Sequence, residues 1–351
     1  MKQISFLSLL LVIVGQAGTA VAQDLVVKAE TLYTSNGPAI EDGVVVIRDG
    51  KIRRVGKQGS VRIPSGVDII EAQVATPGLI DAHSVVGLAG YLNQDTDQDQ
   101  LESSEAIQPE LRAIDAYNTR EALVAWLRSF GVTTVHTGHG PGEIVSGQTM
   151  ITKTAGDTVA EAVIRPAAMV AATLGEAAQP ASEGRQSPGP RAKTVAMLRS
   201  ELIKAQAYVA KRDAAEDDDE IEPPARDLRL EALAAVLRGD MPLLVTVNRH
   251  NDIVTALRIA AEFGIGIVLD SAAESYLLLD EIKAANVPVL LHPPMKRAWG
   301  ETENASFTTA RKLADAGIAV TIQSGYESYV PKTRVVLFEA AILLQHGFSL
   351  D

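Results

Sequence analysis

Four side chains that could bind a metal ion or transfer a proton lie at or near the ends of predicted strands. His83 follows a Pro-Gly turn and a short apolar run that begins at Leu79, and His136 closes a β-branched run; Lys153 and Asp270 stand late in two further strands. Because the carboxyl ends of the strands in a parallel barrel meet at one face, these groups could form a single site. The alternative, which we favour for His136, is a strand-end side chain in a structural hydrogen bond, since clustered polar groups mark functional sites only in some cases.

The rest of the sequence predicts the elements that would position these residues. From residue 228 onward, helical patterns alternate regularly with short apolar runs, which indicates βα units around a parallel sheet. The predicted strands are 79–82, 132–136, 149–153, 243–247, 265–270, 287–291 and 318–322, and the predicted helices are 120–130, 192–212, 228–238, 251–263, 274–285, 306–316 and 332–346. The pattern fits an α/β fold, a (β/α)8 TIM-like barrel with its active site at the carboxyl ends of the strands. A doubly wound open sheet is the alternative, but no dinucleotide-binding fingerprint opens the first βα turn.

Residues 24–74 predict a separate, small β layer. Short β-rich runs alternate with turns there, and the pair Asp49-Gly50 between two such runs is a strong signal for a β-hairpin. We interpret this region as a β-sandwich portion that leads into the strand before His83. The predicted organisation is a signal peptide over 1–22, a β-sandwich portion over 23–75 and a barrel over 76–351.

The first residues have the pattern of a secretory signal peptide. Lys2 gives a positive start, residues 4–14 form an apolar core, and Ala20-Val21-Ala22 is a small-x-small cleavage motif. The apolar core is short for a membrane span, which disfavours an uncleaved anchor. We therefore predict cleavage after Ala22, a periplasmic or secreted location and no membrane attachment of the mature protein. Since the chain contains no cysteine, it has no disulfide bonds, and any metal site must use histidine, carboxylate or lysine.

Composition and charge narrow the choice of partners and ions. The 351 residues carry a net charge of −12, whereas a phosphate backbone is bound by a basic surface, so we predict no nucleic-acid partner. The string Asp95, Asp97 and Asp99 suggests a calcium loop. However, Gln100 stands where the sharp turn needs glycine, and Ala106 replaces the closing acid. We interpret this stretch as a solvated loop.

One decapeptide, residues 74–83 with the sequence VATPGLIDAH, resembles the signature of the amidohydrolase superfamily, in particular its secreted imidazolonepropionase-like branch. The runs 43–52, 131–135, 226–240 and 252–260 are similar to that branch as well, so the resemblance covers nearly the whole mature chain. It implies a barrel joined to a β-sandwich portion and one or two divalent metal ions, typically zinc, that lower the pKa of a bound water. The implied reaction is hydrolysis of a C–N bond in a non-peptide amide, a cyclic amide or a dipeptide-like substrate.

Four positions where the family has metal ligands carry other residues in this chain. The second histidine of the family's His-x-His pair is Val85, and the histidine expected after the fifth strand is Thr246, or Asn248 if the register shifts by two. The positions expected to hold a histidine after the sixth strand and an aspartate after the eighth are Ser271 and Ser324. These side chains are poor ligands for zinc or cannot bind it at all.

Few residues remain that could bind a metal ion. By resemblance, His83 and Lys153 are vestigial metal ligands, and His136 and Asp270 could join them in a rebuilt site. Because three or more ligands must converge on Zn²⁺, the four replacements predict that metal binding is weak or absent.

Two functions are compatible with these observations. The first is an exported hydrolase of C–N bonds acting on a small amide-like molecule. The second is a catalytically inactive, metal-free relative that serves as a binding protein or as the partner of an intact paralogue. For either function, a homo-oligomer is a further possible assembly. The chain ends at Asp351, before the strands that complete the family's sandwich, so we expect either a fragment or a natural truncation with an incomplete sandwich.

Overall fold

The computed structural model describes residues 24–92, 94–178, 189–326 and 335–348. The predicted signal peptide and its cleavage site lie outside these residues. The chain divides into two compact units, the first ending at Pro77 and the second beginning at Gly78. Across the described ranges, no helix is both long enough and apolar enough to cross a membrane.

The first unit is a four-stranded sheet in the order β3-β2-β1-β4. Its strands are β1 Leu25–Leu32, β2 Ile40–Arg48, β3 Lys51–Lys57 and β4 Asp68–Ala75. The predicted hairpin is confirmed, because β2 and β3 pair antiparallel and both Asp49 and Gly50 have the positive φ that the tight turn requires (52° and 67°). Val26, Val44 and Val46 form the buried core of this sheet. The described residues of this unit build one sheet, and the second layer of the predicted β-sandwich is not seen among them.

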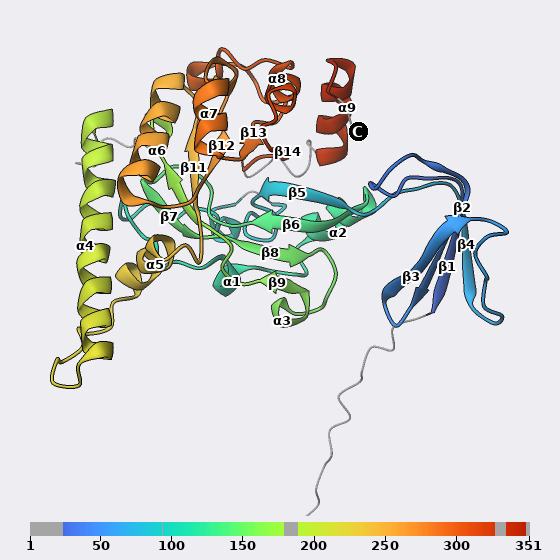
Figure 1. The fold of residues 1–351 in the computed structure, drawn as a ribbon, viewed down its shortest axis with the longest axis horizontal. Helices are drawn as coiled ribbons and strands as arrows, with labels where there is room; N and C mark the ends of the chain where they lie inside the picture. The colour runs from blue at the N-terminus through green and yellow to red at the C-terminus, as the bar shows by residue number, and fades with distance from the viewer. Residues whose placement is uncertain (1–23, 93, 179–188, 327–334, 349–351) are drawn as a thin grey trace, which may run out of the picture. The chain divides into compact units, whose positions relative to one another are not determined.

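The second unit contains two sheets (Figure 1). A six-stranded sheet has the order β14-β13-β12-β11-β10-β7, and a four-stranded sheet has the order β5-β6-β8-β9. The strands are β5 Leu79–Ser84, β6 Val132–Thr137, β7 Val145–Gln148, β8 Met150–Lys153, β9 Val163–Arg165, β10 Val170–Thr173, β11 Leu243–Val247, β12 Ile267–Ser271, β13 Val289–Leu291 and β14 Val320–Ile322. Strands β10 to β14 are parallel, as the alternation of strands and helices predicts.

The two sheets do not form the single closed (β/α)8 barrel that the sequence predicts. The physical reason lies in residues 145–153, which run antiparallel to their neighbours and divide between the sheets: β7 pairs with β10, and β8 pairs with β6. On the opposite side, β5 meets the end of β14 through an isolated parallel bridge between Ser84 and Gly325. There the amide of Gly325 donates to the carbonyl oxygen of His83 at 3.2 Å. The strands of the two sheets therefore do not form one continuous hydrogen-bonded ladder, and the ring of strands is not closed.

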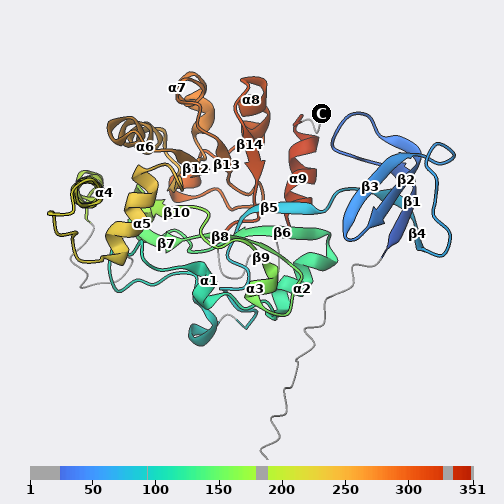
Figure 2. The same cartoon turned by 60° about the horizontal axis from the view of Figure 1, so that its bottom comes forward.

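The helices of the second unit cover the outer faces of the strands, and Figures 1 and 2 show α6 to α9 following one another along the parallel strands. The helices are α1 Ala113–Ala116, α2 Ala122–Ser129, α3 Val159–Ala162, α4 Arg191–Asp217, α5 Leu228–Leu237, α6 His250–Phe263, α7 Leu279–Ala285, α8 Thr309–Asp315 and α9 Val336–Gln345. Short 3₁₀ turns occupy Asp95–Asp97, Glu176–Ala178, Ser275–Leu277 and Gly300–Thr302.

The helix predicted over 120–130 begins two residues later, because the carboxylate of Glu121 accepts a hydrogen bond from the amide of Leu123 and caps the first turn.

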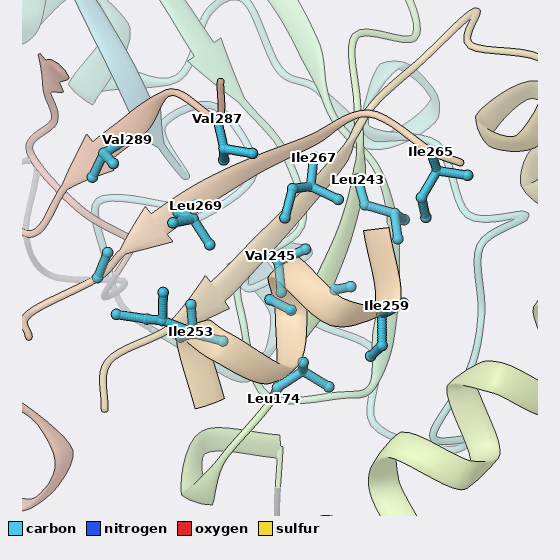
Figure 3. Packing of buried hydrophobic residues seen from close by; sticks show 14 of the residues in the cluster. Leu174, Leu243, Val245, Ile253, Ile259, Ile265, Ile267, Leu269, Val287 and Val289 are labelled. Carbon is cyan, nitrogen blue, oxygen red and sulfur yellow. The ribbon is translucent and has the colours of Figure 1, made fainter. Parts of the chain in front are cut away.

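Alternation along the parallel strands separates an outer core from an inner layer. Figure 3 shows side chains of β11 to β13 and of α6 gathered in the outer core, among them Val245, Leu269 and Ile253. Residues one position away point to the other side of the sheet. There, Leu244 and Val268 belong to a smaller buried cluster together with Leu290, Ala82 and Met169. Thr246, Asp270 and His292 each follow two residues after a member of that cluster, so they continue the inner layer at the carboxyl ends of the strands.

Candidate functional site

A buried pair between His83 and Asp270 forms the centre of the candidate site. His83 lies near the end of β5 and Asp270 near the end of β12, and their side chains are 1% and 0% exposed. Nδ1 of His83 lies 3.0 Å from Oδ1 of Asp270. The structure thus joins two of the four residues singled out from the sequence, although they stand 187 positions apart in the chain.

Two further side chains fix the carboxylate of Asp270. The hydroxyl of Thr246 donates to Oδ2 at 2.7 Å, and the amide of Gln323 donates to Oδ1 at 2.8 Å. Burial alone would raise the pKa of Asp270, but the neighbouring His83 and the hydrogen bonds from His83, Thr246 and Gln323 outweigh it and hold this pKa below its usual value. Asp270 is therefore a carboxylate that can only accept, so the proton in its bond to His83 sits on Nδ1 of the imidazole. In the neutral form of that ring the lone pair is on Nε2, which has no hydrogen-bond partner among the described residues.

His136 lies beside this pair but has no open nitrogen. The rings of His83 and His136 are 5.6 Å apart, centroid to centroid. Nδ1 of His136 lies 2.7 Å from the carbonyl oxygen of Ala82, and its Nε2 lies 2.6 Å from the hydroxyl of Thr149. Burial, together with the adjacent His83, lowers the pKa of His136 to about 4. This imidazole is neutral at pH 7, and both of its nitrogens are engaged in hydrogen bonds within the protein.

Lys153 lies apart from this cluster. Its side chain is exposed at the end of β8, and its Nζ donates to the hydroxyl of Thr134 at 3.1 Å. In the pairing of β6 with β8, Lys153 stands opposite Thr134, whereas Ile151 stands opposite His136. The structure therefore brings together His83, His136 and Asp270 but not Lys153.

Two other histidines are buried in the second unit. Both nitrogens of His139 and the Nε2 of His292 have no hydrogen-bond partner in the described part of the chain, and Nδ1 of His292 lies 3.1 Å from the carbonyl oxygen of Pro293. Burial lowers the pKa of each histidine to about 4. Both imidazoles are therefore uncharged at pH 7.

The residues present do not fit the zinc centre that the resemblance implies. Thr246 is bonded to Asp270, the hydroxyl of Ser271 donates to Oδ1 of Asn248 at 2.7 Å, and Ser324 is bonded to Asp81. The side chains at three positions expected to be ligands are thus used in the protein's own hydrogen bonds. Within residues 24–92, 94–178, 189–326 and 335–348, no group of three or more histidine, aspartate or glutamate side chains could hold a metal ion.

An aromatic residue borders His83 and a basic residue contacts that aromatic ring, and the sequence did not point to either. The ring of Tyr326 lies 5.6 Å from the ring of His83, centroid to centroid. Nζ of Lys296 donates to the hydroxyl of Tyr326 at 3.0 Å and lies 4.7 Å from its ring centroid. Lys296 belongs to a segment beyond β13 without strand or helix, where periodicity gives no signal for the direction of a side chain.

Comparisons with known proteins agree with this fold. No family model matches the chain. A crystal structure of an amidohydrolase from Thermotoga maritima MSB8 superposes with a TM-score of 0.86 and 24% identity, over 93% of this chain and 84% of that one. The chain has an amidohydrolase fold. A. niger ochratoxinase matches more distantly, with a TM-score of 0.48 and 15% identity over 93% of this chain and 80% of that one.

One curated protein is similar over part of the sequence. The Amidohydrolase tasK of Hapsidospora irregularis is 28% identical over 159 residues, which are 36% of this chain and 16% of that protein. The match spans a small part of that longer relative, so its activity is not transferred to this chain.

Proposed function

We propose that this protein is a hydrolase of a C–N bond in a small amide-like molecule, with His83 as its acid–base group. The observation that carries the proposal is the unpartnered Nε2 of a buried imidazole whose Nδ1 lies 3.0 Å from the carboxylate of Asp270. This arrangement sets the tautomer of a general base and stabilises the imidazolium that forms when the base takes a proton. The amidohydrolase fold supports the choice of a C–N bond, by analogy of fold.

The chemistry needs one water molecule and one imidazole. Nε2 of His83 takes a proton from the water while the water oxygen forms a bond to the carbonyl carbon and the π electron pair of the carbonyl moves to its oxygen, to return when the C–N bond breaks. The imidazolium then returns that proton to the nitrogen of the leaving amine as the C–N bond breaks. Asp270 remains a carboxylate throughout and compensates the positive charge on the ring. Because the polar groups around this pair are engaged with one another, we propose that the reaction proceeds without a resident metal ion.

The decisive experiment combines a substrate screen with metal quantitation on the full chain. Non-peptide amides, cyclic amides and dipeptides are offered with and without a chelator. We expect hydrolysis that is insensitive to the chelator and that falls by at least about a hundredfold in His83→Gln, the usual scale for losing a general base. His346→Gln is the matched control, because His346 is exposed on the last turn after α9. Activity that requires added zinc, or that survives in His83→Gln, would contradict the proposal.

A second candidate function is binding without catalysis, in a homo-oligomer or with an intact paralogue as partner. It is favoured by the engagement of Thr246, Ser271 and Ser324 in hydrogen bonds at positions where the family has ligands. The same screen separates the two functions. Saturable binding of an amide-like compound with no turnover in the unmodified chain would support the second. For either function we propose an exported protein, periplasmic or secreted, on the basis of its N-terminal sequence.

A further inference from the structure

The first unit contains a cavity of about 810 Å³ whose wall carries four arginines. The arginines are Arg48, Arg53, Arg54 and Arg62, and Val46 and Ile63 contribute apolar surface. All of these residues belong to the unit that ends at Pro77. The residues that line this cavity thus all come from the first unit.

A bulge in the hairpin concentrates the arginines. In the pairing of β2 with β3, Val46 stands opposite Arg54 and Ile47 stands opposite Ile52, so Arg53 is an extra residue without a partner across the ladder. A bulge of this kind changes the direction of consecutive side chains. Arg53 and Arg54 consequently both line the cavity, although neighbouring residues of a regular strand point to opposite faces.

The charges of these arginines are only partly balanced. Arg48 lies 3.8 Å from Asp24, and Arg53 lies 3.2 Å from Asp49, which also lines the cavity. Arg54 and Arg62 form no ion pair within the described residues of the chain. Four guanidinium groups thus face two carboxylates, so two positive charges at this cavity have no acidic partner among those residues. The whole chain, by contrast, has a net charge of −12. Like charges gathered at one place repel each other unless an anion lies between them.

We propose that this cavity binds the phosphate group of a small phosphate ester or of a phospholipid headgroup. The two unbalanced charges match a phosphate dianion, and the planar donors of Arg54 and Arg62 suit its oxygens in bidentate geometry. Ser65 adds a hydroxyl donor to the wall, and the partly buried Ile63 offers apolar contact to an organic part of the ligand. Arg48 and Arg53 are the two arginines of the wall that already face an acid. This site does not depend on the function proposed for the second unit.

The test measures binding to the full chain by calorimetry and by vesicle sedimentation. Inorganic phosphate and glycerol 3-phosphate serve as free ligands, and vesicles of phosphatidylglycerol are compared with vesicles of phosphatidylcholine. We expect saturable binding to at least one phosphate source that weakens by about tenfold in Arg54→Gln and in Arg62→Gln, the change that 1.4 kcal/mol produces. Arg311→Gln removes one positive charge that is also exposed, on α8, and should bind as the unmodified chain does.

Comparison of the calorimetry with the vesicle sedimentation assigns the source of the phosphate. Binding of glycerol 3-phosphate with no preference between vesicles indicates a soluble ester, whereas binding confined to phosphatidylglycerol vesicles indicates a headgroup. The proposal is overturned if no phosphate source binds saturably. It is equally overturned if Arg54→Gln and Arg62→Gln bind as tightly as Arg311→Gln.

Discussion

Asp81 of β5 accepts hydrogen bonds from both the backbone amide and the hydroxyl of Ser324, just beyond β14. These bonds connect the four-stranded sheet of the second unit to the six-stranded one at the edge where their ladders do not continue. Asp81 is fully buried, and this burial raises its pKa to about 6 against the opposing effect of the bonds from Ser324. One carboxyl group therefore makes the contact between the sheets sensitive to pH.

The first prediction concerns the pH dependence of stability. Asp81 has a pKa of about 6 in the folded chain, above the value near 4 of an unfolded aspartate, so folding favours its protonated form. Its contribution to the free energy of unfolding is fully present below about pH 4 and is lost as the pH rises through about 6, a change of roughly 3 kcal/mol. Asp81→Asn removes this titration. Urea unfolding at pH 4.5 and pH 7 should show the unmodified chain losing more stability than the variant, and parallel pH profiles would contradict the assignment.

The second prediction compares the loss of the Asp270 carboxylate, which pairs with His83, with the loss of the Thr246 hydroxyl, which donates to that carboxylate. Asp270→Asn should reduce kcat by about 10²–10⁴-fold, because the carboxylate that fixes the tautomer and balances the imidazolium is gone. Thr246→Val should cost only about tenfold, since it removes one hydrogen bond at 2.7 Å and leaves the charge in place. Nitrogen chemical shifts of His83 give a readout apart from activity. They should report a proton on Nδ1 in the unmodified chain and a mixture of tautomers in Asp270→Asn, and unchanged shifts would argue against the pairing.

The third prediction concerns Gly175, which has a φ of +88°. A Cβ there would lie 2.5 Å from Oε1 of Glu301 and 2.9 Å from Oδ2 of Asp252, two carboxylates that bind Arg191 at 3.3 and 3.0 Å. Gly175→Ala should therefore lose more than the roughly 1–2 kcal/mol that a left-handed backbone costs an L-residue. Gly239→Ala is the matched control, with a φ of +79° and no atom within 4 Å of the added Cβ. Equal losses in chemical denaturation would show that the carboxylates do not oppose the new side chain.

Much of the second unit follows from local sequence pattern. The strand predicted over 243–247 is β11 with the same bounds, and the strand predicted over 132–136 is β6 with one residue more. Alternation along such strands also places Asp270 in the inner layer, where it meets His83. What local pattern does not contain is the pairing between strands. The split of 145–153 between two sheets depends on its antiparallel partners, and those partners lie far away in the sequence.

The same limit explains the details of the candidate site. Lys153 is a candidate in the sequence because it lies late in a strand. Which residue of β6 its side chain lies opposite, however, depends on the register of β8 against β6. Thr246 stands at a position where a ligand is expected and Gln323 stands one residue before another, and their role as donors to Asp270 requires three strands in register. The arginine cavity of the first unit likewise depends on a bulge that the Asp-Gly hairpin signal does not specify.

The last prediction concerns metal content. The full chain purified without chelator should hold well below one zinc per molecule, since His83 offers a single open nitrogen and its neighbour His136 offers none. A chelator should leave the Tm unchanged, and added zinc should raise it no more than magnesium does, because an ion without a site on the folded state cannot stabilise that state by mass action. Val85→His, which places an imidazole two residues after His83, should increase zinc retention if its fold is intact by the same melting assay. Elemental analysis that finds one or more tightly bound metal ions per unmodified chain would contradict this prediction.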